Sequence, residues 1–340
     1  MELAPDGLTV VIGENGQGKT NLLEALGWLA TLSSFRGVTN DALVRQSAAN
    51  AYVRAEVDRD GRTMLLEAEI PQRGAPRVLV NGNALKRSGD LLGALRVSVF
   101  SPDDLALIKA GPAHRRQLLD DALVALSARH AETIAAVDRV LKQRGALLRS
   151  AGGKATPDVV STLDVWDSKL AEHGNALVEA RRDLVTRLEP LVAKAYAAVA
   201  SGAAAIALRY VPSWSDDLHA ALTAARADDL RRGVTTIGPH RDELDLHIGS
   251  LPARTHASQG EQRSLALALR LAVHDAVSEA TGTPPILLLD DVFSELDPHR
   301  SAALLAALPG GQAILTTAGA LPAGAAPAAT VTIENGVVTS

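Results

Sequence analysis

The stretch Gly13-Glu14-Asn15-Gly16-Gln17-Gly18-Lys19-Thr20 carries glycines, a lysine and a threonine at the spacing of a phosphate-binding loop. An apolar run from Leu8 to Ile12 precedes it, and a helical pattern begins at Asn21. The glycines let the backbone curl so that N–H groups point at phosphate oxygens, and the helix N-terminus adds a positive dipole end. We therefore expect this stretch, with Asn21, to bind ATP, Lys19 to contact the β- and γ-phosphates, and Thr20 to hold Mg²⁺.

Two consecutive acids, Asp290 and Asp291, end the apolar run Ile286 to Leu289. An unbroken apolar run is typical of a strand buried on both faces of a parallel sheet. Beside a phosphate-binding loop, the first acid can hold Mg²⁺ and the second can orient or deprotonate the attacking water. We expect Asp290 to be a metal ligand and Asp290, Asp291 and Lys19 to be catalytic. Helix capping by strand-end aspartates is the alternative.

A third candidate element is Ser258-Gln259-Gly260-Glu261, which opens a helical pattern that runs to about Ala280. Serine followed by glutamate three residues later is typical of a capping box. A helix N-terminus with a serine is also a suitable place for a γ-phosphate. Both interpretations stay open, and we count these four residues among the expected nucleotide-binding residues.

Composition limits the classes of partner. The chain has 340 residues with 47% hydrophobic and 3% aromatic content, a net charge of −5 and no cysteine. Disulfides and thiolate metal sites are therefore excluded. Scarce aromatic residues make base stacking an improbable main mode of nucleic-acid binding, and a basic surface has to be local rather than global.

Neither a signal peptide nor a membrane span is expected. The segment 1–13 has no basic region, and Pro and Gly residues interrupt the apolar stretch 301–329. We expect a cytoplasmic protein without a membrane partner.

The order of patterns predicts an α/β fold with a helical insertion. Hairpin signals at Asp60-Gly61 and Asn81-Gly82 indicate an antiparallel sheet within 51–81, after the phosphate-binding loop. Long helical periodicity then covers 114–150 and 158–200, and alternating and apolar strand patterns return after 235. We predict a discontinuous head of residues 1–111 and 235–340 and a helical domain of residues 112–234. The arginine pairs of that domain could be a solvated face or a binding surface.

Several motifs together resemble known ATPases. Ser258 to Gln262 is similar to the signature motif of ATP-binding-cassette ATPases, and Ser294 to Asp297 resembles their D-loop. Over nearly its whole length the chain resembles the RecF family of bacterial recombination mediators. The stretches that carry this resemblance are 13–25, Ser33-Ser34-Phe35-Arg36-Gly37, 100–104, 111–120, Gly238-Pro239-His240-Arg241-Asp242, 258–262 and 288–297.

This resemblance implies a Rad50-like head of the ATP-binding-cassette class, with a mixed sheet, an antiparallel β part and a short helical arm. It implies an ATP-dependent homodimer with slow, DNA-stimulated ATP hydrolysis. It also implies binding to gapped DNA and to junctions of single- and double-stranded DNA. The implied partners are RecR and RecO, which act in loading RecA during repair, replication restart and the SOS response.

Three features depart from the family pattern. RecF-like sequences usually carry a Phe-Arg-x-Tyr-type strand ahead of the strand at 8–12, so part of the expected nucleotide-base contact has no counterpart here. The switch histidine of cassette ATPases is replaced by Thr316 or Thr317. Asp291 replaces the catalytic glutamate of transporters.

Two other ATPase classes compete with this interpretation. A transporter's cassette subunit is disfavoured by the long helical insertion and by the Asp290-Asp291 pair. A chromosome-maintenance clamp would need coiled-coil arms far longer than residues 112–234.

Overall fold

The computed structural model describes residues 1–59, 61–200 and 204–339. The chain forms two compact units. The first contains Met1–Leu105, Lys194–Ala203 and Arg263–Ser340, and the second contains Ala106–Ala193 and Ala204–Gln262. We describe each unit by itself.

The first unit is built on a six-stranded sheet. Its strands are β6 (Val97–Phe100), β10 (Ile286–Asp290), β11 (Gln312–Thr317), β1 (Gly7–Ile12), β12 (Pro327–Glu334) and β13 (Val337–Val338), in this spatial order. All neighbours pair in parallel except β12 and β13, which form an antiparallel hairpin. Carboxyl ends of parallel strands meet at one edge, so the segments after β1, β10 and β11 lie close together.

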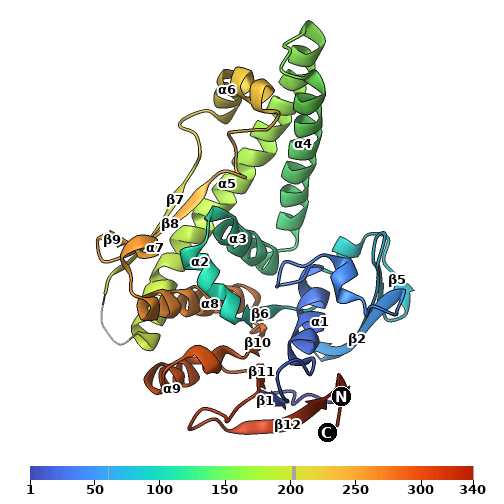
Figure 1. The fold of residues 1–340 in the computed structure, drawn as a ribbon, viewed down its shortest axis with the longest axis vertical. Helices are drawn as coiled ribbons and strands as arrows, with labels where there is room; N and C mark the ends of the chain where they lie inside the picture. The colour runs from blue at the N-terminus through green and yellow to red at the C-terminus, as the bar shows by residue number, and fades with distance from the viewer. Residues whose placement is uncertain (60, 201–203, 340) are drawn as a thin grey trace. The chain divides into compact units, whose positions relative to one another are not determined.

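A second sheet of this unit is antiparallel, as predicted; Asp60 of the first predicted turn lies outside the described residues. It contains β2 (Asn50–Arg59), β3 (Arg62–Pro71), β4 (Arg77–Val80) and β5 (Asn83–Ala84). Helix α1 (Lys19–Thr31) packs against β10, β11 and β6 and also against β2 and β3 (Figure 1). Its residues Leu23 and Trp28 are fully buried in two different apolar cores, so one helix joins both sheets.

Shorter elements complete the first unit. They are the 3₁₀ turns η1 (Asn40–Leu43), η2 (Ser88–Leu91), η3 (Pro102–Leu105) and η4 (Val292–Glu295), and helix α9 (Pro298–Ala307). Helix α8 (Gln259–Thr281) begins in the second unit and continues into the first. On α8, Arg270 forms an ion pair of 2.6 Å with the buried Asp104, which fastens the helix to η3.

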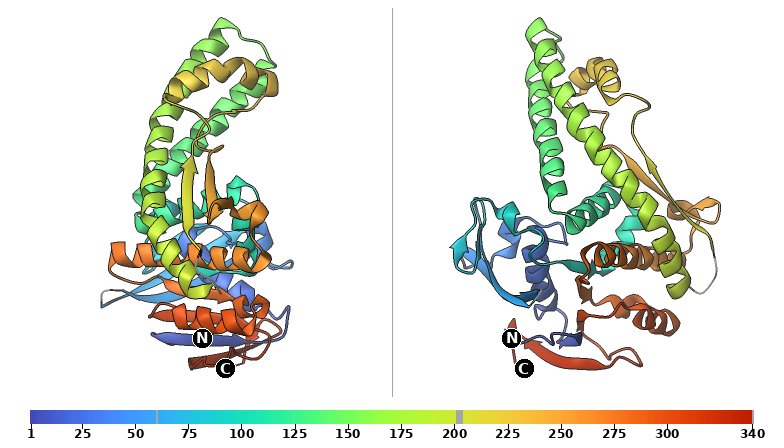
Figure 2. Two further views of the ribbon diagram at one scale, coloured as in Figure 1. Left: turned by 90° about the vertical axis from the view of Figure 1, so that its left-hand side faces the viewer. Right: turned by 180° about the vertical axis from the view of Figure 1, so that it is seen from behind.

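The second unit is mainly helical. It contains α2 (Ala106–Lys109), α3 (Pro112–Leu126), α4 (Arg129–Ala151), most of α5 (Pro157–Val199), α6 (Leu218–Arg232) and α7 (Ala253–His256). Figure 2 shows α4 and the first part of α5 as an antiparallel pair joined by a short turn. The predicted helical segment 114–150 is in fact two helices, which are separated at 127–128. The helix at 158–200 continues through Pro190.

One strand of the second unit was missed by the sequence prediction, which treated 112–234 as helical. Strand β7 (Ile206–Val211) pairs antiparallel along its whole length with β8 (Glu243–Ile248), and β8 pairs with β9 (Leu251–Pro252). This pairing explains why residues 235–262 group with the helical segments, whereas the predicted division placed them in the head. The large apolar side chains of Ile206, Leu208 and Tyr210 recur at every second position, and this period of two is the sequence signal that could have revealed β7.

Buried charges hold the helices of this unit together. Arg144 of α4 is fully buried and donates hydrogen bonds of 2.7 Å to Asp167 of α5 and to Asp229 of α6, both of which are also fully buried. Arg226 of α6 donates a further bond to Asp167. Since each partner belongs to a different helix, the network fixes α4, α5 and α6 to one another.

The sequence analysis expected no membrane-spanning segment, and the length and apolar character of the helices bear on this. Among the residues that the structure describes, no helix combines the length and the apolar character needed to cross a bilayer.

Candidate nucleotide site

The loop between β1 and α1 has the shape expected of a phosphate-binding loop. Gly16 and Gly18 adopt positive φ values of 82° and 99°, which glycine reaches without steric cost. Gly18 is also the residue from which α1 begins, and Leu22 N–H donates to its carbonyl at 3.2 Å. The first turn of α1 therefore directs free backbone N–H groups towards the loop, where an anion is favoured.

Lys19 is held within this loop. Its side chain is buried, and its Nζ donates hydrogen bonds to the carbonyl oxygens of Gly13 (2.7 Å) and Glu14 (2.8 Å). A lysine ammonium has three N–H donors, so one remains for a ligand. The two carbonyls fix the position of the Lys19 ammonium. A phosphate could therefore bind to it without a rearrangement of the lysine side chain.

Asp290 at the end of β10 meets Thr20 at the start of α1. Its Oδ1 accepts hydrogen bonds from the hydroxyls of Thr20 (2.9 Å) and of Thr316 on β11 (2.7 Å). Sequence reasoning predicted the meeting of Thr20 and Asp290, which lie 270 residues apart along the chain. Thr316 was not assigned this role; the sequence analysis considered it only as a replacement of the switch histidine.

The donor set fits a magnesium ion. Mg²⁺ in nucleotide sites is bound through one or two protein oxygens and phosphate oxygens, with water completing an octahedron. Thr20 supplies a hydroxyl and Asp290 a carboxylate whose Oδ2 accepts no hydrogen bond from the described residues. No group of three or more His, Asp or Glu residues in the described chain could hold a metal alone, so a metal here would need the nucleotide's oxygens.

Asp291 lies beside this pair in an unusual backbone conformation. Its φ is +47°, and its N–H donates to Oγ1 of Thr316 at 3.0 Å. It lines a hollow of about 440 Å³ together with Asn15 and Thr317. Of the two threonines that could replace the switch histidine, Thr317 is the one that lines this hollow, whereas Thr316 is bonded to Asp290.

The buried Glu24 pairs with the exposed Arg36, a contact that the sequence analysis did not assign. Arg36 makes an ion pair with Glu24 of α1, and Ser34 donates to the other oxygen of this carboxylate. Arg36 also donates to the amide of Asn21 at 3.4 Å. The Ser33 to Gly37 stretch therefore folds back onto α1, the helix that follows the phosphate-binding loop. Its Arg36 contacts Asn21 in the first turn of that helix.

Ser258 and Glu261 belong to the second unit and form the capping box that was one of the two predicted readings. The Ser258 N–H and hydroxyl donate to Glu261 Oε2 at 2.8 and 2.7 Å, and the Glu261 N–H donates to Ser258 Oγ at 3.3 Å. Ser258 and Gln259 are exposed, and Glu261 is half-buried. The cap does not use the N–H groups of Gln259 and Gly260, which point outward from the helix start.

The Gly238 to Asp242 turn has a structural role in the second unit. Arg181 of α5 donates to the Pro239 carbonyl (2.8 Å) and makes a bidentate pair with Asp120 of α3. Tyr210 of β7 donates to Asp242 at 2.5 Å. Burial raises the pKa of Asp242 and lowers that of His240 to about 4, so this histidine is neutral near pH 7. The motif thereby anchors β8 to the helices.

The chain has close relatives among known proteins. Residues 2–317 match the family described as the RecF/RecN/SMC N terminal domain. A DNA replication and repair protein RecF from Streptomyces avermitilis is 45% identical over 328 residues, which cover 92% of this chain and 87% of that protein. A RecF from Frankia alni is 46% identical over 333 residues, with the same coverage. The chain belongs to the RecF family.

Solved structures agree with this RecF assignment. The structure of a recombination mediator protein RecF with ATP, from the RecFOR pathway, has a TM-score of 0.90 and 30% identity, and covers 99% of this chain and 92% of that chain. An SMC head bound to the winged-helix domain of ScpA has a TM-score of 0.54 at 16% identity, covering 99% and 90%, and shows a shared fold alone. The predicted fold class, a head of the RecF and SMC type, is confirmed.

Replacement of Lys19 tests the loop directly. Lys19→Ala removes the fixed ammonium, and a charge-assisted hydrogen bond is worth about 1.5–3 kcal/mol. We expect ATP affinity, measured with a fluorescent analogue, to fall by about one to two orders of magnitude. Lys86→Ala, at an exposed lysine of the same unit, is the control and should leave it unchanged. Equal affinities for both variants would remove Lys19 from the site.

Proposed function

We propose that this chain binds ATP with Mg²⁺ and hydrolyses it slowly, and that DNA stimulates the hydrolysis. The observation that carries the ATP site is the convergence of Thr20 and Asp290 on one point beside the phosphate-binding loop. That geometry supplies a metal position next to the expected β- and γ-phosphates. ATP in the RecF structure supports the choice of nucleotide.

In the hydrolysis step, Asp291 acts as the base that orients the attacking water. Asp291 lines the hollow together with Asn15 of the phosphate-binding loop, at the sheet edge where the parallel strands β1 and β10 end. Asp290 instead supplies a metal-binding oxygen. This division of labour assigns the proton acceptor and the metal ligand to adjacent residues at the end of β10.

The division predicts different losses in the two variants. Asp291→Asn should keep ATP affinity and lose hydrolysis by about two orders of magnitude or more, because the amide cannot accept the proton. Asp290→Ala should instead lose the Mg²⁺-dependent part of ATP binding. Phosphate release and nucleotide binding, measured in parallel, separate the two. Identical behaviour of the variants would contradict the assignment.

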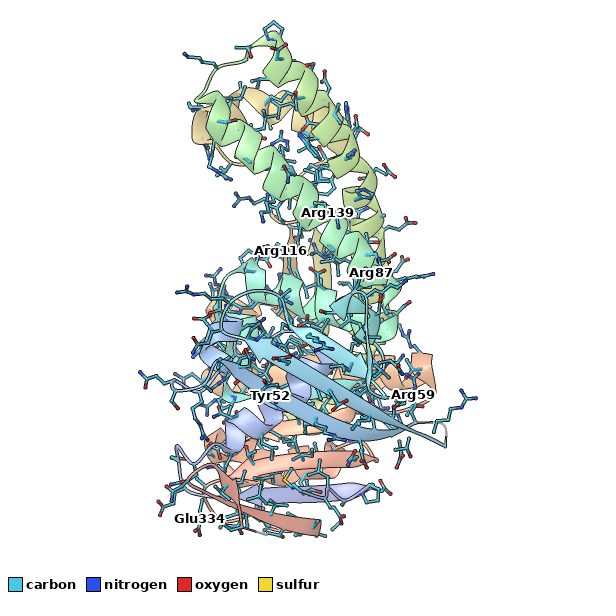
Figure 3. The ribbon with its side chains drawn as sticks, turned by 90° about the vertical axis from the view of Figure 1, so that its right-hand side faces the viewer. Tyr52, Arg59, Arg87, Arg116, Arg139 and Glu334 are labelled. Carbon is cyan, nitrogen blue, oxygen red and sulfur yellow. The ribbon has the colours of Figure 1, made fainter. Side chains whose placement is uncertain are left out.

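We further propose that the chain is a recombination mediator, as the name of its relative of solved structure suggests, and that it binds gapped and junction DNA. We propose RecO and RecR as its partners, the loading of RecA as the outcome, and the cytoplasm as its location. Support within the chain comes from α4. Arg139, Lys142 and Arg149 are exposed, and within the described part of the chain none has an ion-pair partner; Arg139 is labelled in Figure 3.

These three cations share one face of α4. Spacings of three and seven residues bring side chains back to the same side of a helix. At a rise of about 1.5 Å per residue, they cover about 15 Å of helix. Duplex DNA carries one charge per about 1.7 Å of its axis, so a stripe of this length faces several phosphates. Because the whole chain has a net charge of −5, DNA needs a local basic surface, and this stripe is our candidate for it.

The stripe predicts how salt affects DNA binding. Replacing Arg139, Lys142 and Arg149 with Ala should weaken binding to gapped DNA and reduce the slope of log affinity against log salt by about two to three. Arg231→Ala with Arg232→Ala is the matched control, because these arginines of the same unit already pair with Asp228. A slope unchanged in the triple variant would contradict the proposal for α4.

An ATP-dependent homodimer completes the proposed cycle. The phosphate-binding loop surrounds one side of a triphosphate, and the start of α8 offers N–H groups that could meet the γ-phosphate of a second copy. An isologous dimer would supply two such sites from one surface. Ser258, Gln259, Gly260 and Glu261 would then bind nucleotide held by the partner, and hydrolysis would release the dimer from DNA.

Ser258 tests the dimer. Ser258→Arg places a bulky side chain at the proposed interface, and we expect sedimentation with ATP and Mg²⁺ to show a monomer that still binds ATP. Ser258→Thr keeps the capping hydroxyl and should dimerise as the unmodified chain does. The proposal is wrong if the arginine variant dimerises normally, or if the unmodified chain stays monomeric at saturating ATP.

A further inference from the structure

The turn of the β12–β13 hairpin is bonded to the phosphate-binding loop. Gly336 N–H donates to the carbonyl of Gln17 at 3.1 Å, and Asn335 N–H donates to the side-chain Oε1 of the same glutamine. Glu334, which precedes the turn, is labelled in Figure 3. These bonds join residues that lie more than 300 positions apart in the chain, and all of them belong to the first unit.

The hairpin also approaches the phosphate-binding loop closely at two of its glycines, Gly13 and Gly18. A side chain at Gly13 would place its Cβ 2.5 Å from the carbonyl oxygen of Ile333, the second-last residue of β12. A side chain at Gly18 would place its Cβ 3.6 Å from Cα of Gly336. The hairpin therefore touches the loop at its beginning, at Gln17 and at its end, and β12 itself pairs in parallel with β1.

We propose that the Asn335–Gly336 turn is a positioning element for nucleotide binding, which holds the phosphate-binding loop in its curled form. The proposal rests on the nucleotide binding proposed above. The turn engages Gln17 through its backbone carbonyl and its side-chain Oε1, which fixes the orientation of the side-chain amide and leaves its N–H donors for a ligand. The turn thereby fixes the peptide that precedes Gly18, from which the first N–H groups of α1 follow.

The chain contains a closely matched control. The Asn81–Gly82 turn joins β4 to the two-residue strand β5, as Asn335–Gly336 joins β12 to the two-residue strand β13. The φ values of the paired residues agree, at 52° and 77° against 50° and 75°. Neither Gly82 nor Gly336 has an atom within 4 Å of an added Cβ. The two turns thus differ in what they touch, not in their own geometry.

Proline at the second turn residue separates positioning from simple stability. Proline fixes φ near −65° and has no N–H, so Gly336→Pro removes the bond to Gln17 and the turn geometry, whereas Gly82→Pro disrupts only the matched turn. With the full-length chain, we expect Gly336→Pro to weaken binding of a fluorescent ATP analogue by about tenfold or more. Gly82→Pro should change affinity by less than about twofold, although it should change Tm by about as much as Gly336→Pro does.

Two further measurements, the shift of Tm by ATP and hydrogen exchange at residues 335–336, distinguish weaker ATP binding from a loss of folded protein. Added ATP and Mg²⁺ should raise the Tm of the unmodified chain and of Gly82→Pro alike, and raise that of Gly336→Pro much less. Because coupling is reciprocal, ATP should slow hydrogen exchange at the N–H groups of Asn335 and Gly336 in the unmodified chain. If Gly336→Pro does not fold, the milder pair Gly336→Ala and Gly82→Ala and the exchange measurement decide.

The outcomes distinguish the two proposals. Failure of the unmodified chain to bind ATP would overturn the proposed function. Binding by the unmodified chain with equal affinities for both turn variants, or exchange at 335–336 that ATP does not slow, would overturn the positioning role of the turn alone.

Discussion

The carboxylate of Asp290 is the point on which the first unit converges. It accepts hydrogen bonds from the start of α1 and from the end of β11, and it ends β10 itself. Three segments from opposite ends of the sequence are therefore held at one atom. This arrangement depends on the parallel order of β1, β11 and β10, because only parallel neighbours bring their carboxyl ends to the same edge. A shift of register in any of these strands would separate Thr20, Asp290 and Thr316.

A phosphate-binding loop also needs support on its outer side, and two neighbours provide it. The Ser33 to Gly37 segment is tied to α1 through Glu24, while the β12–β13 turn is tied to Gln17. Glycine is required at position 13 by the carbonyl of Ile333 and at position 18 by its positive φ. The glycines that define the motif thus meet two demands: space for the surrounding backbone and the curl that presents N–H groups to an anion.

Local patterns were sufficient for much of this fold and site. The positions of the loop, of Asp290 and Asp291, and of the capping box at Ser258 could all be predicted, because each motif is a short run with its own strand or helix pattern. Strand β7 and the grouping of residues 235–262 could not, since both depend on pairing between Ile206–Val211 and Glu243–Ile248. The contact between Gln17 and Gly336 carries no local signal at all, because backbone N–H groups of a turn can bond to any nearby acceptor.

Buried charges add directional order to the apolar core of the helical unit. An apolar cluster of Leu148, Leu163 and Leu230 joins α4, α5 and α6, and the buried Arg144 lies between the same three helices. A buried ion pair adds little net stability, because desolvation offsets much of the attraction. Its directional hydrogen bonds, however, allow only one arrangement of the helices, since any other would leave a charge buried without a partner. The exposed cations Arg139, Lys142 and Arg149 stand on the helix that Arg144 fixes. A rigidly held helix favours DNA binding by such a surface, because the spacing of its cations is already set. The entropy cost of ordering them on DNA is then smaller.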